Sequence, residues 1–437
     1  MKLKLCSLIC IICLLLSLTT ALSSCNLLDS WRAFDAQINE NGELIVTYPD
    51  GSQKNLGVVK GQDGADGQDG ADGKDGINGE KGADGADGKD GANGSNGSLV
   101  ISGEDSSITY ASAMGLRSSV RIICGSAEGS GVIYRLDKNA GDAYVITNYH
   151  VVYDTGGISN NINAYLYGAE TEEKAMTAKY VGGSLYYDIA VLHIENSDIL
   201  KAADVAAAEI ADSDKISLGD SAIAIGNAKG YGIAVSSGII SVDSEYIEMT
   251  AANGYTKIAV RVMRVDTAVN HGNSGGGLYS REGKLIGIVN AKIVEDDVEN
   301  MGYAIPSNLA TALADNIIHY CDNSTQTSPM IAELGVTLSV TDTKAIYDTT
   351  TGKITIKETL SVESVKDGSI AQAEINVGDI LISAEMNGKA IEIYRLHHLK
   401  DLLINARQGD TLALKVERGG QEITLNISIT EACIKVA

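Results

Sequence analysis

The stretch DTAVNHGNSGGGLY, at positions 266–279, places Ser274 among glycines. A serine hydroxyl is a weak nucleophile at neutral pH, so it needs a neighbouring base, a group that orients this base, and hydrogen-bond donors for the developing oxyanion. The base must come from the six histidines of the chain. His271 adjoins the glycines, and His150 lies in AYVITNYHVV, where a β-strand is expected to end at a Thr-Asn turn. Taken alone, either could equally be a solvated or a core histidine, so these residues by themselves leave the base undecided.

Short β-branched runs must position these side chains. Between positions 101 and 294, runs such as SVRIIC, DIAVLHI and KLIGIVNAKI alternate with Gly, Asn and Asp. This spacing is typical of an antiparallel barrel or sandwich rather than of alternating strands and helices. We expect a helix after Pro306, where Ser307 offers an N-cap. Residues 321–330 are expected to form a polar linker.

Three segments point to one protease group. GSGVIYRLDKNAGDAYVITNYHVV, YYDIAVLHI and DTAVNHGNSGGGLY occur in this order, accompanied by AVSSGIIS and GYAIPSNLA. Together they resemble the trypsin-like serine proteases of the HtrA/Deg group. The resemblance implies that His150 is the base, Asp188 its orienting acid and Ser274 the nucleophile, with the backbone N–H groups of Gly272 and Ser274 as the oxyanion hole. On its own, Asp188 would be interpreted as a surface aspartate that caps a strand.

The same resemblance implies the fold. It predicts a mainly β chain whose protease domain, residues 101–320, is a trypsin-like double barrel of six strands each, with the active site in the cleft between the barrels. Two other interpretations of the glycine stretch are weaker. A phosphate-binding loop would require a Lys and a following helix, and an α/β-hydrolase elbow would require G-x-S-x-G before a helix.

Two residues beside the nucleophile depart from the group's pattern. His271 and Gly277 stand where these proteases usually have proline. Both replacements are expected to loosen the backbone around Ser274. His271 is either an exposed turn residue or part of the substrate pocket, and the sequence does not decide between them.

Residues 331–430 resemble a PDZ domain, an α+β unit. The resemblance rests on VESVKDGSIAQAEINVGDILISAEMNGKAI, on the helical run HHLKDLLINARQGD and on a closing hairpin that turns at Gly419-Gly420. PDZ domains bind a peptide C-terminus as an added strand and hold its carboxylate on backbone N–H groups of a short loop. The matching loop is Leu334-Gly335-Val336. TDTKAIYDTTTGKITIKETL is a longer insertion than usual, and the alternative for the whole unit is a small domain packed for stability alone.

The N-terminal region is predicted to be a targeting signal followed by a spacer. LSSC, ending at Cys25, resembles a lipobox, which implies a lipoprotein signal peptide over residues 1–24 and lipidation of Cys25; the alternative is an ordinary secretory signal. Residues 25–60 predict short strands. Glycine then recurs at every third position from 61 to 97, as in a collagen triple helix. Because this tract lacks proline and is rich in Asp, a disordered stalk is the alternative.

The net charge limits the classes of binding partner, and the number of cysteines limits the number of disulfide bonds. The net charge of −23 excludes the basic footprint that nucleic acids require. After loss of the signal, Cys124, Cys321 and Cys433 allow one disulfide at most.

The functional prediction is an extracytoplasmic serine endopeptidase, anchored to the bacterial membrane by its lipid. It would act on unfolded or misfolded proteins and peptide C-termini, without a metal or organic cofactor. The G-X-Y tract and the protease group both suggest a homotrimer. A catalytically silent PDZ scaffold and a stalked surface-interaction protein are the alternatives.

Overall fold

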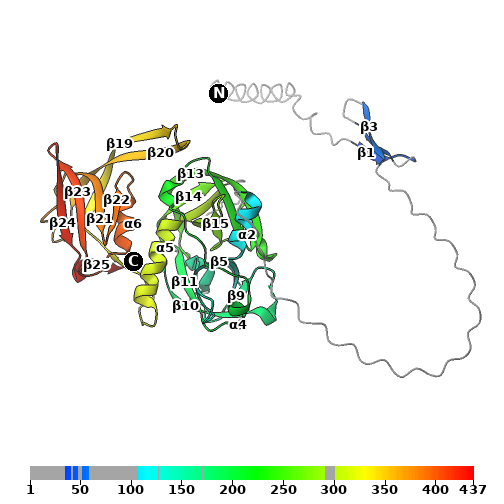
Figure 1. The fold of residues 1–437 in the computed structure, drawn as a ribbon, viewed down its shortest axis with the longest axis horizontal. Helices are drawn as coiled ribbons and strands as arrows, with labels where there is room; N and C mark the ends of the chain where they lie inside the picture. The colour runs from blue at the N-terminus through cyan, green and yellow to red at the C-terminus, as the bar shows by residue number, and fades with distance from the viewer. Residues whose placement is uncertain are drawn as a thin grey trace, which may run out of the picture. The chain divides into compact units, whose positions relative to one another are not determined.

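The computed structural model describes residues 35–40, 43–47, 52–58, 107–290 apart from 126, 155 and 170, and 301–437. The chain divides into two compact units, Met1–Asp90 and Gly91–Ala437. In the first unit three strands form an antiparallel sheet: β1 (Asp35–Ile38), β2 (Glu43–Thr47) and β3 (Gln53–Val58) (Figure 1). The predicted signal peptide, Cys25 and the tract at 61–97 lie outside the described residues.

The second unit begins with helix α2 (Ile108–Leu116) and a closed six-stranded barrel. Its strands, in barrel order, are β10 (Met176–Ser184), β11 (Ile189–Ile194), β6 (Asp142–Thr147), β5 (Ala127–Asp137), β4 (Ser119–Cys124) and β9 (Ile162–Leu166). Alternate side chains of β4, at Val120, Ile122 and Cys124, are fully buried, as expected for a strand with one face on the core. Minor elements flank the barrel: α3 (Tyr149–Val152), β7 (Tyr153–Asp154), β8 (Gly157–Ile158), η2 (Glu172–Lys174) and α4 (Asp198–Ala202).

A second closed barrel follows, after the 3-10 turn η3 (Ser213–Lys215). In barrel order its strands are β12 (Ser221–Gly226), β13 (Ala234–Thr250), β14 (Lys257–Val265), β17 (Gly302–Pro306), β16 (Leu285–Val289) and β15 (Gly277–Tyr279), with the turn η4 (Ala228–Gly230) after β12. Two closed barrels of six strands each confirm the predicted mainly β, trypsin-like double barrel.

Helix α5 (Ser307–Cys321) confirms the helix predicted after Pro306, but its expected cap is wrong. Pro306 is the N-cap residue, and Ser307 is the first helical residue. The hydroxyl of Ser307 is buried and donates to the carbonyl oxygen of Ala211 at 2.8 Å. Its hydrogen bond therefore joins the helix to the second barrel instead of closing the helix end.

Among the described residues, no helix combines the length and the apolar character needed to cross a membrane.

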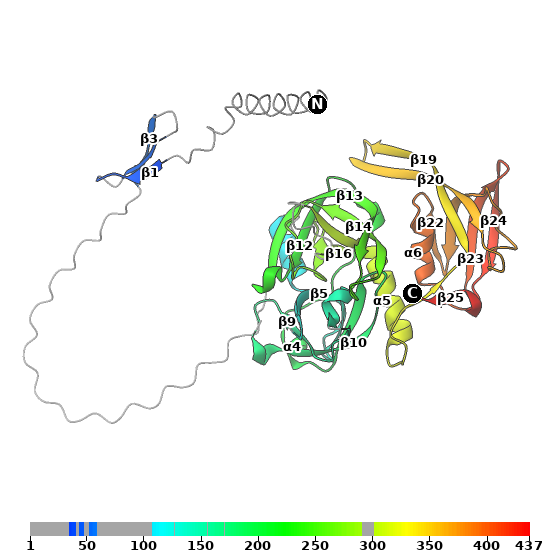
Figure 2. The same cartoon turned by 180° about the vertical axis from the view of Figure 1, so that it is seen from behind.

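The C-terminal part is a PDZ-like sheet and helix, in agreement with the prediction. Its elements are β18 (Met330–Ala332), β19 (Val336–Asp348), β20 (Lys353–Val365), β21 (Ile380–Met386), β22 (Lys389–Glu392), α6 (His398–Ile404), β23 (Thr411–Arg418), β24 (Gln421–Ser428), η6 (Glu431–Cys433) and β25 (Ile434–Val436). The hairpin between β23 and β24 turns at Gly419 and Gly420, which both have positive φ, as such tight turns require. Both ribbon views place α5 between the barrels and α6 (Figures 1 and 2).

The long insertion of this unit has a structural role. It forms the outer part of the β19–β20 hairpin. The backbone N–H of Ile354 donates to the Ser217 hydroxyl at 2.8 Å, and the Lys353 ammonium lies 3.2 Å from Asp220. We call the contacts of Ser217, Arg261, Lys353, Arg395 and Asp401, which join the PDZ-like unit to the second barrel, the junction.

Candidate active site

Asp188 and His150 form a hydrogen-bonded pair between two strand ends of the first barrel. The Nδ1 atom of His150 lies 2.7 Å from Oδ2 of Asp188, and the His150 backbone N–H donates to Oδ1 at 3.0 Å. Asp188 has a positive φ of 52°, a conformation that aspartate tolerates better than most residues. Its side chain is only 3% exposed. The carboxylate is thus fixed in two directions and holds the imidazole in one orientation.

Ser274 lies on a tight turn that leads into β15 of the second barrel. The N–H of Gly276 donates to the carbonyl oxygen of Asn273 at 2.9 Å, which closes the turn around Ser274. Gly275 has φ of +82°, and a Cβ there would lie 2.2 Å from the Ser130 carbonyl oxygen. Gly272 has φ of +93°, and a Cβ would lie 2.1 Å from the carbonyl oxygen of Asn227. Both positions therefore require glycine, for backbone conformation and for space.

Ser130 joins the two halves of this site. It belongs to β5 of the first barrel, and its hydroxyl donates to the carbonyl oxygen of Gly272 at 2.7 Å. The same hydroxyl accepts from the N–H of Asn227 in the second barrel at 2.8 Å, and the Ser130 N–H donates to the carbonyl oxygen of Ser274 at 2.8 Å. We call these three hydrogen bonds the seam. They hold the loop of Ser274 against the barrel that carries His150.

Three family models match the chain. That of the trypsin-like peptidase domain matches residues 129–288, that of the PDZ domain residues 332–429, and that of the collagen triple helix repeat residues 50–106. The chain is 33% identical over 316 residues to "Serine protease Do-like HtrA" of Bacillus subtilis (strain 168), covering 70% of this chain and 64% of the relative. It is 32% identical over 319 residues to the protein of the same name from Lactococcus lactis subsp. cremoris (strain MG1363), covering 70% of this chain and 72% of the relative.

The chain belongs to the HtrA family of serine proteases. This confirms the resemblance drawn from the motifs, including the PDZ and collagen-like regions. Among solved structures, "HtrA-type protease AlgW with tripeptide" aligns with a TM-score of 0.49 and 25% identity, covering 75% of this chain and 97% of that one.

Two asparagines of this HtrA chain support the pair and were missed by the sequence analysis. The side chain of Asn290 donates to Oδ2 of Asp188 at 2.8 Å, and that of Asn148 donates to the Asp188 carbonyl oxygen at 2.9 Å. Both asparagines are fully buried. A buried amide within an apolar run, such as Asn290 in LIGIVNAK, is the available signal, because it requires a polar partner.

The two departures beside the nucleophile behave differently from each other. Gly277 lies in β15, paired with Ile225 on one side and Ile288 on the other, so the expected loosening is wrong at this position. Instead, a Cβ at Gly277 would lie 2.3 Å from the ring of Tyr279. Tyr279 is fully buried, with its hydroxyl 2.8 Å from that of Ser118. His271 is exposed, and its carbonyl oxygen accepts from the N–H of Lys229 at 2.7 Å.

The predicted peptide loop lies at the start of β19. Leu334 is 3% exposed, and Gly335 has φ of +78°, with its carbonyl oxygen accepting from the N–H of Lys366 at 2.7 Å. Leu334, Gly335 and Val336 line a cavity of about 950 Å³ together with residues of α6, among them Leu403. A loop beside a helix is the arrangement that carboxylate capture by PDZ domains requires.

The three cysteines of the second unit are buried as free thiols: Cys124, Cys321 and Cys433. Burial raises the pKa of Cys321 to about 11. A thiol with such a pKa is protonated at neutral pH and therefore inert as a nucleophile.

Proposed function

We propose that this chain is a serine endopeptidase of HtrA type that cleaves misfolded or exposed protein segments. The observation that carries the proposal is the 2.7 Å contact between His150 and Asp188, on the barrel to which the seam ties the loop of Ser274. His150 takes the proton of the Ser274 hydroxyl as its oxygen attacks the scissile carbonyl, and then donates this proton to the leaving amine. Asp188 holds the imidazole tautomer and stabilises the imidazolium.

The backbone N–H groups of Gly272 and Ser274 donate hydrogen bonds to the oxyanion of the tetrahedral intermediate and stabilise its negative charge. Collapse of this intermediate leaves an acyl group on Ser274. Water, deprotonated by His150, then releases the acyl group and restores the serine. This chemistry proceeds with the triad and backbone donors, and it requires neither a metal nor an organic cofactor.

The proposal extends to binding and location. The loop Leu334-Gly335-Val336 captures peptide C-termini, in keeping with its position beside the cavity at α6. Cleavage before Cys25 and its lipidation anchor the chain outside the cytoplasm, consistent with relatives named periplasmic endoproteases. The G-X-Y tract, if wound into a triple helix, assembles three copies into a homotrimer.

Hydrolysis of unfolded casein by the purified chain tests the activity. Ser274→Ala removes the nucleophile and is expected to abolish cleavage. Ser280→Ala is the matched control, because Ser280 is also buried but lies beyond β15, and it should cleave like the wild type. Equal inertness of the wild type and Ser274→Ala, with peptide binding retained, would instead identify a silent PDZ scaffold.

A further inference from the structure

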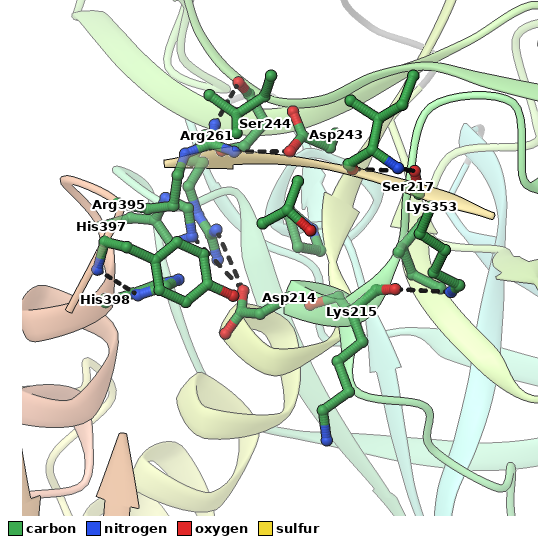
Figure 3. Close-up of a pocket in the computed structure, with 17 residues that line it drawn as sticks. Asp214, Lys215, Ser217, Asp243, Ser244, Arg261, Lys353, Arg395, His397 and His398 are labelled. Carbon is green, nitrogen blue, oxygen red and sulfur yellow. Dashed lines mark hydrogen bonds and ion pairs between the residues drawn. The ribbon is translucent and has the colours of Figure 1, made fainter. Parts of the chain in front are cut away.

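A cluster of three possible metal ligands lies where the PDZ-like unit meets the second barrel. Asp214 comes from η3 on the barrel side, and His397 and His398 come from the start of α6. Each offers one ligand atom, and the three atoms lie within 4.8 Å of one another. Figure 3 shows the three side chains converging on one cavity from two parts of the chain. None of them takes part in the proposed peptidase chemistry.

One separation in the cluster is close to that between two ligands on one zinc ion. Tetrahedral zinc with bonds of about 2.0–2.1 Å separates neighbouring ligand atoms by roughly 3.4 Å. The Nε2 atom of His397 lies 3.5 Å from Oδ1 of Asp214. The widest separation in the cluster, 4.8 Å at most, would need to shrink by roughly 1.4 Å to reach the zinc value. Two imidazoles and one carboxylate are a donor set that zinc favours.

A backbone carbonyl orients one of the imidazoles for metal binding. The Nδ1 atom of His398 lies 3.0 Å from the carbonyl oxygen of Glu392 and 3.4 Å from the backbone nitrogen of Tyr394, and the shorter of these contacts is the one in which Nδ1 carries the proton. When Nδ1 carries the proton and donates it there, Nε2 keeps its lone pair. Histidines that bind metals regularly donate their second ring N–H to such a carbonyl, which fixes both tautomer and ring direction. His397 and His398 are each 5% exposed, so their rings are also held by packing.

Each cation that lines the cavity, Arg261 included, is paired with a carboxylate, so none stands unopposed beside the cluster. One guanidinium nitrogen of Arg261 lies 4.0 Å from Asp214, but another is bonded to Asp401 at 2.5 Å. The cavity lining carries four cations and two carboxylates, and the ion-pair partners of these cations add four more carboxylates. These are Lys215, Arg261, Lys353 and Arg395 against Asp212, Asp214, Asp220, Asp243, Glu358 and Asp401.

The ion would also have an entry path. Asp214 and His398 line a second cavity of about 450 Å³, on the side of Asn308 and Asn405. This volume exceeds that of one water molecule more than tenfold. It can therefore admit a hydrated ion and supply a water ligand.

We propose that Asp214, His397 and His398 bind a divalent transition metal ion of the zinc class, with water as the fourth ligand. Because the ligands come from two parts of the chain, the bound ion ties the PDZ-like unit to the second barrel. This role is structural and does not depend on the proposed peptidase activity.

Zinc titration of the full chain, first freed of metal by a chelator, tests the site by calorimetry. Asp214→Asn keeps the size of the side chain and removes its charge, and His397→Gln removes one imidazole. His319→Gln is the matched control, because His319 is an exposed histidine near the end of α5. The wild type and His319→Gln should bind one more equivalent of Zn²⁺ than Asp214→Asn and His397→Gln, or bind it at least tenfold more tightly. Weak binding by other carboxylates is common to all four proteins.

Cobalt provides a readout that does not depend on how the variants fold. Co²⁺ in a four-coordinate site absorbs visible light far more strongly than hexahydrated Co²⁺, so the wild type should develop these bands and lose them when Zn²⁺ is added. The melting temperature should rise with Zn²⁺ in the wild type and in His319→Gln, and less in the other two variants. Absence of the cobalt bands in the wild type, or equal zinc stoichiometry and affinity in all four proteins, would overturn the proposal.

Discussion

Asp188 in the active site and Asp401 in the junction are both withdrawn from solvent, yet different groups stabilise them. Asp188 accepts hydrogen bonds from an imidazole, a backbone N–H and the neutral amide of Asn290. Asp401 instead pairs with the guanidinium of Arg261 at 2.5 Å. A catalytic carboxylate must stabilise a charge that forms on its partner during the reaction, so a permanent cation beside it would compete. Asp401 has only a structural role and stabilises no charge that forms during a reaction, so a permanent ion pair with Arg261 can hold it.

Burial and nearby charges shift the pKa values of the ionisable groups in and beside the junction. Burial raises the pKa of Asp401 to about 6, although Arg261 lowers it. Burial also lowers the pKa of His397 to about 3. For Asp214, burial would raise the pKa, but the hydrogen bond from His397 and the charge of Arg261 outweigh it, so its pKa lies below the usual range. At neutral pH the imidazole of His397, beside the junction, is therefore neutral, while the carboxylates of Asp214 and Asp401 are ionised.

The largest expected effect is on catalysis. Asp188→Asn should lower kcat for casein on the order of 10⁴-fold, because an amide no longer selects the required tautomer of His150. Asp188→Asn should change the free energy of unfolding by much less than it raises the activation free energy of the reaction. Stopped assays together with urea unfolding measure both quantities. A variant that keeps more than a tenth of the wild-type kcat would remove Asp188 from the catalytic role.

The reverse pattern is expected in the junction. Arg261→Met leaves Asp214 and Asp401 without their cation and should cost about 3–5 kcal/mol in the unfolding transition that involves the junction. Casein cleavage per folded molecule should remain close to that of the wild type at low temperature.

Arg135→Met is the matched control for this variant. Arg135 forms an ion pair with Asp315 at 2.7 Å, but both side chains are well exposed, at 50% and 37%. Its removal should cost less than about 1 kcal/mol. Denaturant unfolding measures the loss of stability in both variants. Equal losses would show that burial does not increase the contribution of the junction ion pair to the free energy of unfolding.

A smaller effect is expected for an ion pair inside the PDZ-like unit. Asp379 accepts two hydrogen bonds of 2.7 Å from Arg418 and one of 2.9 Å from the N–H of Asn376. Burial raises its pKa, but these bonds outweigh burial and the pKa lies below its usual value. Asp379→Asn should therefore cost about 1.5–3 kcal/mol at pH 7.

The pH dependence of this variant follows from the sign of the shift. A carboxyl whose pKa is lower when folded stabilises the protein above the unfolded pKa of about 3.9. This stabilisation is lost as the pH falls through the folded pKa. The difference in melting temperature between the wild type and Asp379→Asn should thus narrow from pH 5 to pH 2. A difference that stays constant over this range would contradict the assigned cause.

His150, Asp188 and Ser274 could be proposed as a triad from sequence because each lies in a short local pattern at the edge of a strand. The glycines of G-N-S-G-G allow the positive φ values that the turn around Ser274 needs, so part of this geometry is encoded in the local sequence. The same holds for the hairpin at Gly419-Gly420. Ser307 is the counterexample, since its hydroxyl bonds to Ala211, 96 positions earlier, and not to its own helix end.

Contacts between distant segments escaped prediction for the same reason. Arg261 stands in the run IAVRVMRV and looks like an ordinary strand residue. Its partner Asp401 is 140 positions away, and Ser130 reaches Gly272 across 142 positions. No local pattern of residues encodes such pairs, because they depend on how the closed barrels and the PDZ-like unit are placed.

The hydrogen bonds of Ser130 also bear on the order in which activity and β-structure should be lost on heating. His150 and Asp188 belong to one barrel and Ser274 to the other, so their alignment depends on the contacts between the barrels, among them the seam and the hydrogen bond from Asn290 to Asp188. The hydrogen bonds between the barrels are far fewer than those of the ladders that close each barrel. On heating, peptidase activity should therefore disappear before the β-sheet signal does. The protein would pass through a state that keeps its β-sheets but has lost the alignment of Ser274 with His150.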